Sequence, residues 1–426
     1  MTHKKKHPWY RPRHYLHFDQ PVGLKSAQSI VASPCRVSKH AFYPLISYKV
    51  TAEKVYKDPG TNNLKKKSKE RPIAYAAHMD SQIYAYYSHL LSQKYENKLK
   101  DLGVTDSVLA FRSLGKSNID FASDAFKMIK AFGECAVVAL DVSGFFDNLD
   151  HAELKKQWAY LLDTNSLPDD HFAVYKSLTS FSTVDKEKLY DRLGISIHNP
   201  KNGRKRVCTP SEFRDLVRGE GLITSNPNRY GIPQGSPLSA LISNIYMLGF
   251  DKRSHDFASK HNGKYYRYCD DMLFIMPLSY REEVEVKVAE EIGSVKLKIN
   301  TDKTVIREFR ISGERLISDK PLQYLGFTYD GESIYVRSSS LARYSDRMRR
   351  GVRLAKTTKI KRNRDKIQRG IPRKELYRKK LYSRYSHLGK RNFIRYALRA
   401  AETMGSKSIK KQIKPLWNRL IEEIEK

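Results

Sequence analysis

Apolar runs and alternating patterns predict a core sheet in the middle of the chain. Residues 136–142 form an almost continuous apolar run broken only by Asp141, as expected for a strand buried on both faces. Residues 264–276 contain two aromatic-rich runs that meet at Asp270 and Asp271, which predicts a β-hairpin with two carboxylates at its tip. Further strands are predicted at residues 71–77, 295–299 and 322–328.

Helical spacing of apolar residues predicts helices between these strands. They are expected at residues 80–100, at 282–292, and from an N-cap at Asp150 to Leu162. Ser236 and Pro237 suit the N-cap and N1 positions of a long helix that follows them. Residues 1–70 are basic and predicted to be irregular, and residues 165–228 are interpreted as an insertion or peripheral subdomain.

The composition changes near residue 338. Residues 341–426 contain 28 Lys and Arg against 7 Asp and Glu, while their apolar residues keep helical spacing. This pattern predicts a small helical domain with strongly basic outer faces. An excess of one sign this large favours a groove for a nucleic acid duplex over an ordinary solvated surface.

The charge of the whole chain also indicates a polyanionic partner. Its 79 basic and 46 acidic residues leave a formal net charge of +33, which nucleic acid would neutralise most simply. A generally basic protein, or one bound to an anionic membrane, is the alternative. No apolar run is long enough to span a membrane or to form a signal peptide, and the four cysteines are too far apart for a zinc knuckle. A reducing, cytoplasmic location is therefore expected.

Three acidic residues form the candidate catalytic site. Asp141 ends the buried strand, and Asp270 and Asp271 occupy the hairpin tip, so the three carboxylates are expected to come together. With the backbone carbonyl of Val142 they would offer hard oxygen ligands to two Mg²⁺ ions, with Mn²⁺ as a substitute. Asp141 as a simple turn cap, and the acidic pair as a solvated turn, are the structural alternatives.

An ordered set of motifs resembles the bacterial reverse transcriptases, which are RNA-directed DNA polymerases. The motifs are Arg71-Pro72-Ile73, Phe111-Arg112-Ser113, Leu140-Asp141-Val142 with Phe145-Phe146-Asp147, Gly231-Ile232-Pro233-Gln234-Gly235, Tyr268-Cys269-Asp270-Asp271, Lys303 and Leu325-Gly326-Phe327. The resemblance implies an α+β right-hand polymerase fold. It places a basic N-terminal extension at 1–70, fingers at 71–135, a palm at 136–335 with a fingers-side insertion at about 165–228, and a helical thumb at 338–426.

The same resemblance implies a role for each motif residue. Asp141, Asp270 and Asp271 match the metal-binding triad, and Lys303 matches a residue that protonates pyrophosphate. The incoming dNTP would be held by Arg71, Arg112 and Gln234, with Phe146 packing under its sugar and excluding a 2′-hydroxyl. Gly235, Tyr268, Leu325 and Gly326 would contact primer and template. The alternative for Lys303 and the two arginines is that they are ordinary surface cations.

Within the family, the sequence is most similar to the defence-associated reverse transcriptases, and a stand-alone type 2 system is the first candidate. Those enzymes copy a partner noncoding RNA during phage infection. The Asn-Ala-x-x-His and Val-Thr-Gly segments of retron enzymes are missing, whereas a group II intron enzyme stays an alternative. A maturase-like RNA-binding module without polymerase activity is the alternative from another class. The sequence leaves the template RNA, the priming mode, the oligomeric state and the fate of the DNA open.

Overall fold

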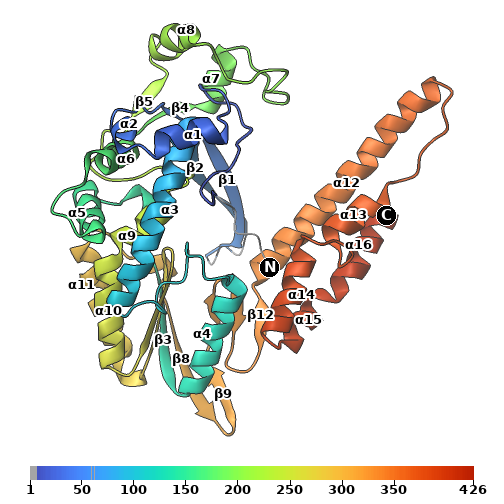
Figure 1. The fold of residues 1–426 in the computed structure, drawn as a ribbon. Coiled ribbons are helices and arrows are strands. Elements are labelled where there is room, and N and C mark those ends of the chain that lie inside the picture. The colour runs from blue at the N-terminus through green and yellow to red at the C-terminus, as the bar shows by residue number, and fades with distance from the viewer. Residues whose placement is uncertain (1–6, 59, 62) are drawn as a thin grey trace.

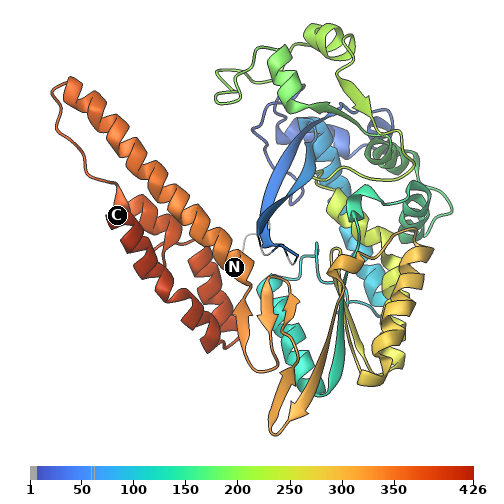
Figure 2. The same ribbon diagram turned by 180° about the vertical axis from the view of Figure 1, so that it is seen from behind.

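The computed structural model describes residues 7–58, 60–61 and 63–426, and the basic run at residues 4–6 lies outside them. The chain forms three parts, each built around its own sheet or helix cluster (Figure 1). We name them fingers, palm and thumb after the arrangement that the motifs predict. The palm occupies the centre, and the fingers and thumb extend from it on either side of an open region (Figures 1 and 2).

The palm is a five-stranded antiparallel sheet in the order β6-β7-β3-β8-β9. Alternate residues of β3 and β7 enter two different hydrophobic clusters, so the sheet is covered on both faces. Helices α9, α10 and α11 pack with the first cluster and α4 with the second. The elements are β3 (Cys135–Asp141), β6 (Lys264–Tyr268), β7 (Asp271–Met276), β8 (Val305–Ser312), β9 (Arg315–Ser318), α4 (Asn118–Phe132), α9 (Ser239–Tyr246), α10 (Leu248–Lys260) and α11 (Arg281–Ser294).

The fingers contain a second sheet, in the order β2-β1-β4-β5. Its strands are β1 (Leu45–Lys57), β2 (Leu64–Tyr75), β4 (Ser182–Asp185) and β5 (Ile223–Ser225). The surrounding helices are α1 (Leu24–Val31), α2 (Pro34–Ser38), α3 (His78–Asp101), α5 (His151–Leu162), α6 (Asp169–Thr179), α7 (Lys186–Arg192) and α8 (Pro210–Glu212), followed by a π-helical turn, Phe213–Arg218. Helix α3 runs down from the fingers beside the palm (Figure 1).

One prediction about this part of the chain is wrong. Residues 1–70 are not irregular, because α1, α2, β1 and the first half of β2 lie among them. Residues 165–228 lie on the fingers side, and they extend the fingers sheet itself, because β4 pairs with β1 and carries the sheet on to β5. The side chains of Val184 and Leu189 from this segment are fully buried with Ile46 of β1 in one hydrophobic cluster. The long-range pairing of β1 with β4 leaves no local sequence pattern, which is why it was missed.

The thumb begins with a small three-stranded sheet and continues as five helices. The strands are β10 (Leu322–Tyr324), β11 (Phe327–Tyr329) and β12 (Ile334–Val336). The helices are α12 (Ser338–Gln368), α13 (Arg378–Tyr385), α14 (Phe393–Thr403), α15 (Lys407–Ile413) and α16 (Pro415–Glu425), which confirms the predicted helical character. Their apolar faces join the cluster that covers the α4 side of the palm sheet, so thumb and palm share one core.

Three predicted elements differ from the structure. The helix after Ser236 and Pro237 starts only at Ser239 and is interrupted at Met247, between α9 and α10. Residues 295–299 are not a strand, since Lys296 adopts a left-handed conformation (φ 56°) directly after α11. Residues 322–328 are two strands rather than one, because Leu325 and Gly326 both have positive φ and turn the chain back on itself.

The buried contact between residues 165–228 and the fingers sheet yields a stability test. Leu189→Ala should lower the free energy of unfolding by about 2–5 kcal/mol, because it removes a fully buried side chain and leaves a cavity. Ile197→Ala is the matched control, since Ile197 is 61% exposed on the same segment. Urea unfolding and limited proteolysis measure the effect. Equal stability of the two variants would show that the segment does not share the fingers core.

Candidate active site

Strand pairing brings the three predicted acidic residues to one end of the palm sheet. Asp141, the last residue of β3, is the register partner of Asp271, the first residue of β7. Beyond the strand, the amide of Val142 donates a hydrogen bond to the carbonyl oxygen of Asp270, 3.2 Å away. The main chain around Asp141 is therefore fastened to the acidic pair, and the three acids lie at the same end of the sheet.

The hairpin between β6 and β7 has a two-residue loop, because Tyr268 pairs directly with Asp271. Its first loop residue, Cys269, has a φ of 62°, a conformation that side chains other than glycine rarely adopt. Cys269 therefore makes the turn that presents the acids. Burial, reinforced by the Asp270 carboxylate, raises the pKa of its thiol, which stays protonated.

A buried ion pair supports this turn from below. Arg267 is fully buried, and its guanidinium forms paired hydrogen bonds of 2.7 and 2.6 Å with the equally buried Asp251 of α10. Arg267 Nη1 also donates to the carbonyl oxygen of Cys269 (3.0 Å) and to Asn244 Oδ1 (3.1 Å). The Tyr265 hydroxyl donates to Asp251 as well, at 2.8 Å. Sequence reasoning missed this network, although an arginine on the inward face of an alternating strand was the available signal.

Charge repulsion marks the acidic cluster. Burial, followed by the neighbouring carboxylates of Asp270 and Asp141, raises the pKa of Asp271 to about 7. The Asp271 side chain is still exposed to solvent, which screens its repulsion by the other two carboxylates. This repulsion therefore destabilises the folded state less than the same pKa shift would for a deeply buried acid. Concentrated negative charge of this kind is what a divalent cation neutralises.

Lys303 supplies a positive charge to the cluster. Its Nζ lies 2.5 Å from Asp141 Oδ1, and the Asn300 side-chain amide lies 3.4 Å from the same oxygen. The Asn300 backbone amide donates to the carbonyl oxygen of Asp141 at 2.7 Å, which ties the Lys303 turn to the end of β3. Within the described residues, no three His, Cys, Asp or Glu side chains are arranged to hold a metal ion. The Lys303 ammonium group lies against Asp141 Oδ1, an oxygen that a metal ion would also use as a ligand. The carboxylate oxygens of the cluster are hard donors, which suit Mg²⁺.

The segment around Gln234 lies against both the fingers and the palm. The carbonyl oxygen of Gln234 accepts a hydrogen bond from the amide of Ala74 in β2 (2.8 Å), and its side chain donates to Asp147 at 3.3 Å. Gly235 has a φ of 115°, and a Cβ there would lie 2.5 Å from the carbonyl oxygen of Ala74. Only glycine fits this approach.

Two more residues predicted to bind the nucleotide flank this segment. The half-buried Phe146 is joined through its carbonyl oxygen to the amide of Ile232, at 2.9 Å. Arg71 is exposed on β2, three residues before Ala74. The structure therefore brings the segments that carry Arg71, Phe146 and Gln234 together.

Arg112 does not fit its predicted role as a ligand of the triphosphate. Its side chain is only 1% exposed, and its guanidinium donates to both carboxylate oxygens of Glu96 at 2.9 and 2.6 Å. It also donates to the carbonyl oxygens of Thr105 and Val108. These N–H donors of Arg112 are thus bonded to acceptors inside the protein, and its buried guanidinium is not free to bind a phosphate. Arg112 instead fastens the loop after α3.

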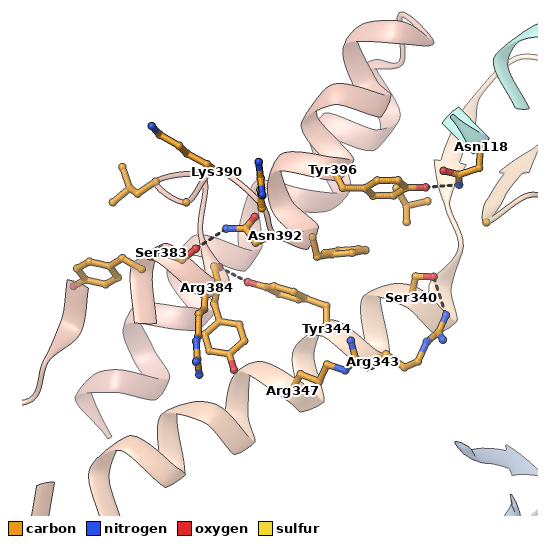
Figure 3. A pocket seen from close by; sticks show the side chains of 18 of the residues that line it. Asn118, Ser340, Arg343, Tyr344, Arg347, Ser383, Arg384, Lys390, Asn392 and Tyr396 are labelled. Atoms are coloured by element: carbon orange, nitrogen blue, oxygen red, sulfur yellow. Dashed lines mark hydrogen bonds between the residues drawn. The ribbon is translucent and has the colours of Figure 1, made fainter. Parts of the chain in front are cut away.

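The Leu325-Gly326 turn opens into a large pocket of the thumb, with a volume of about 1590 Å³ (Figure 3). Asn118 at the start of α4 joins the β10–β11 turn to α14, because its side-chain amide donates to the carbonyl oxygen of Leu325 and to the hydroxyl of Tyr396. Tyr268 stands nearby, edge-on to Phe121 of α4. The lining residues include six cations and no acid: Arg343, Arg347, Lys379, Arg384, Lys390 and Arg391.

Comparison with known proteins shows the family of this chain. A family model described as reverse transcriptase (RNA-dependent DNA polymerase) matches residues 64–329, more than half of the chain. The chain therefore belongs to the reverse transcriptase family. It carries an RNA-directed DNA polymerase domain, and the α+β right-hand polymerase fold is confirmed. Enzymes of this family use a divalent metal and dNTPs.

Two similar solved structures are telomerases. One is apo telomerase from Candida tropicalis (13% identity, TM-score 0.45, 76% of this chain and 54% of that chain). The other is telomerase from Candida albicans in complex with the TWJ fragment of telomeric RNA (13% identity, TM-score 0.40, 94% of this chain and 62% of that chain). The present chain thus spans less than two thirds of either telomerase. No curated protein matches it, and none of its described helices is long and apolar enough to cross a membrane.

The support that the buried Arg267–Asp251 ion pair gives to the β6–β7 turn can be tested by breaking the pair. Asp251→Ala should lower the free energy of unfolding by about 3–5 kcal/mol, because it leaves the Arg267 charge buried without a partner. Lys287→Ala is the control, since it breaks an exposed ion pair on α11 and should leave the urea transition unchanged. If Asp251→Ala unfolds at the wild-type urea concentration, the pair does not support the turn.

Proposed function

We propose that the chain synthesises DNA on an RNA template by two-metal nucleotidyl transfer. The observation that carries this proposal is the register of β3 with β7, which sets Asp141 beside Asp270 and Asp271 in a member of the reverse transcriptase family. The raised pKa of Asp271 supports it, because the cluster holds negative charge that a cation would neutralise.

In this mechanism the carboxylates of Asp141, Asp270 and Asp271 and the carbonyl oxygen of Val142 would hold two Mg²⁺ ions, with Mn²⁺ as a substitute. The metals would activate the attacking hydroxyl and stabilise the leaving pyrophosphate. Lys303 neutralises Asp141 in their absence and lies close enough to the cluster to protonate the leaving group as a general acid.

The fingers residues would orient the incoming dNTP. Arg71 is exposed and suited to grip a triphosphate with its guanidinium. Gln234 is positioned by its hydrogen bond with β2, and the half-buried ring of Phe146 would pack under the sugar. Arg112 contributes indirectly, by fastening the loop after α3 through Glu96.

Primer and template would follow the residues that join palm and thumb. Gly235, Tyr268, Leu325 and Gly326 lie along this path, and the six cations of the thumb pocket would neutralise phosphates of an RNA–DNA duplex. The aromatic side chains of Tyr344 and Tyr396 in the same pocket supply an apolar floor. Such a path accounts for the basic excess of the thumb.

We further propose that the template is a partner noncoding RNA, copied in bacterial defence against phage. The resemblance to defence-associated enzymes, with a stand-alone type 2 system as the first candidate, supports this role. Group II intron and retron enzymes are the alternatives within the family. An RNA-binding maturase-like module without polymerase activity is disfavoured by the intact acidic cluster and by Lys303.

Removal of one carboxylate tests the polymerase proposal. Asp270→Ala should reduce primer extension with dNTPs and Mg²⁺ on an RNA template at least about 100-fold, because charge stabilisation at the reacting phosphate is lost. Asp302→Ala is the matched control, since Asp302 is an exposed acid beside Lys303 and should retain synthesis. Wild-type rates in Asp270→Ala would contradict the proposal.

The role of Phe146 is tested by nucleotide choice. Phe146→Ala should reduce the preference for dNTP over rNTP roughly tenfold or more, because the ring no longer excludes the 2′-hydroxyl. Single-nucleotide incorporation with matched dNTP and rNTP pairs measures the preference. Unchanged discrimination, with DNA synthesis retained, would remove Phe146 from the sugar site.

The biological role is tested by sequencing the RNA that co-purifies with the protein and the DNA made from it. One recurrent noncoding RNA, together with phage protection that Asp270→Ala abolishes, is expected. Intron or retron RNA among the products would instead assign the enzyme to one of the alternative classes.

A further inference from the structure

The far half of α12 and the segment that follows it extend beyond the rest of the thumb (Figure 1). We call residues 353–377 the thumb arm. The first half of α12 is anchored by Tyr344, Met348 and Val352, which are buried in the shared core. None of the residues of the thumb arm is buried. A protrusion of this kind gains little from hydrophobic packing, so its structure needs another explanation.

Specific polar contacts hold the thumb arm in its shape. After α12 ends, the chain turns back, and the side-chain amide of Asn363 donates to the carbonyl oxygen of Lys374 while its oxygen accepts from the Lys374 amide, both at 3.0 Å. Lys359 and Glu375 form an ion pair at 3.3 Å across the same gap. The returning segment is therefore fastened along the helix, and the thumb arm is an ordered projection.

The thumb arm carries positive charge on every side. The thumb arm contains ten Lys and Arg against two acids, Asp365 and Glu375. Successive cations along a helix point in different directions, about 100° apart per residue, so they repel one another without forming one basic face. A helix that is polar on every side and carries an uncompensated positive charge is expected to bind a polyanion.

We propose that the thumb arm binds a folded, base-paired region of the RNA template outside the duplex that the active site is copying. The proposal rests on the proposed function, because it presumes that the chain works on RNA. The thumb arm leads directly into α13, whose Lys379 and Arg384 line the thumb pocket, so RNA leaving that pocket would meet it next. The part of α12 in the thumb arm has no aromatic side chain for base stacking, and the one aromatic residue of the arm is Tyr377, next to α13. This favours contacts with the phosphate backbone of paired RNA.

An anionic membrane is a poorer partner for this surface. An interfacial membrane helix needs its apolar residues on one face, usually with aromatic residues among them. On α12, the exposed Ile360 and Ile367 (55% and 51% exposed) lie on about the same side, but Leu354 (68% exposed) lies about 120° from Ile360. The aromatic residue of the thumb arm, Tyr377, lies outside α12.

The test compares two variants that lose the same charge. The arm variant changes Lys361, Arg362, Arg364 and Arg369 to Gln. Among the described residues, none of these four side chains forms a hydrogen bond or ion pair, and glutamine is a good helix former. The control variant changes the exposed Lys127, Lys130, Lys155 and Lys156 of α4 and α5 to Gln. A fluorescent RNA hairpin serves as the probe, titrated at several salt concentrations. Extension of a primer–template with no RNA beyond its duplex measures synthesis.

The arm variant should bind the hairpin at least roughly tenfold more weakly, with a log–log salt slope smaller by about 2–4, because each lost phosphate contact removes about 0.9 from the slope. The control variant should bind like the wild type, and both should extend the short primer–template normally. A charge-keeping variant, with Lys361→Arg and Arg362, Arg364 and Arg369→Lys, should retain binding.

Each other outcome has a distinct meaning. Wild-type hairpin affinity in the arm variant, or an equal loss in the control variant, would overturn the thumb arm proposal. So would binding to phosphatidylserine vesicles that the arm variant loses while its RNA affinity stays unchanged. Absence of DNA synthesis by the wild-type chain would overturn the proposed function instead, and is measured independently of hairpin binding.

Discussion

Repulsion among three carboxylates is the constraint that shapes this protein. Asp141, Asp270 and Asp271 would separate in a flexible chain, and the antiparallel pairing of β3 with β7 holds them together. That pairing is itself secured by hydrophobic clusters on both faces of the sheet. The hydrophobic core therefore supplies the free energy that keeps like charges adjacent, and the cluster is ready for a cation as a result.

The same constraint explains the polar groups inside the core. A charged pair such as Arg267 and Asp251 is costly to bury and adds little to stability over apolar packing. Here it holds the carbonyl oxygen of Cys269, in a turn whose backbone conformation is unfavourable. The ion pair stabilises the strained backbone of the hairpin tip, because Arg267 holds the carbonyl oxygen of Cys269 in place.

Local patterns were sufficient to predict the centre of the molecule. The strand ending at Asp141 and the hairpin around Asp270 have strong periodicity and short connections, so both were recognised with nearly correct ends. The pairing of β1 with β4 was missed because it joins segments far apart in the chain. The role assigned to Arg112 did not fit, because a motif indicates a residue type but not whether Glu96 already satisfies its guanidinium. Arg267 was overlooked because its partners lie on two other helices.

The attachment of Asp141 has an evolutionary consequence. Hydrogen bonds to Asp270 on one side and Asn300 on the other involve main-chain groups at the end of β3, which every residue except proline can provide. Side chains at the end of β3 can therefore change over generations without displacing the main chain of Asp141, provided that no residue is inserted or deleted within these strands. Tolerance of substitution and intolerance of length change should accordingly coexist in the same short segments.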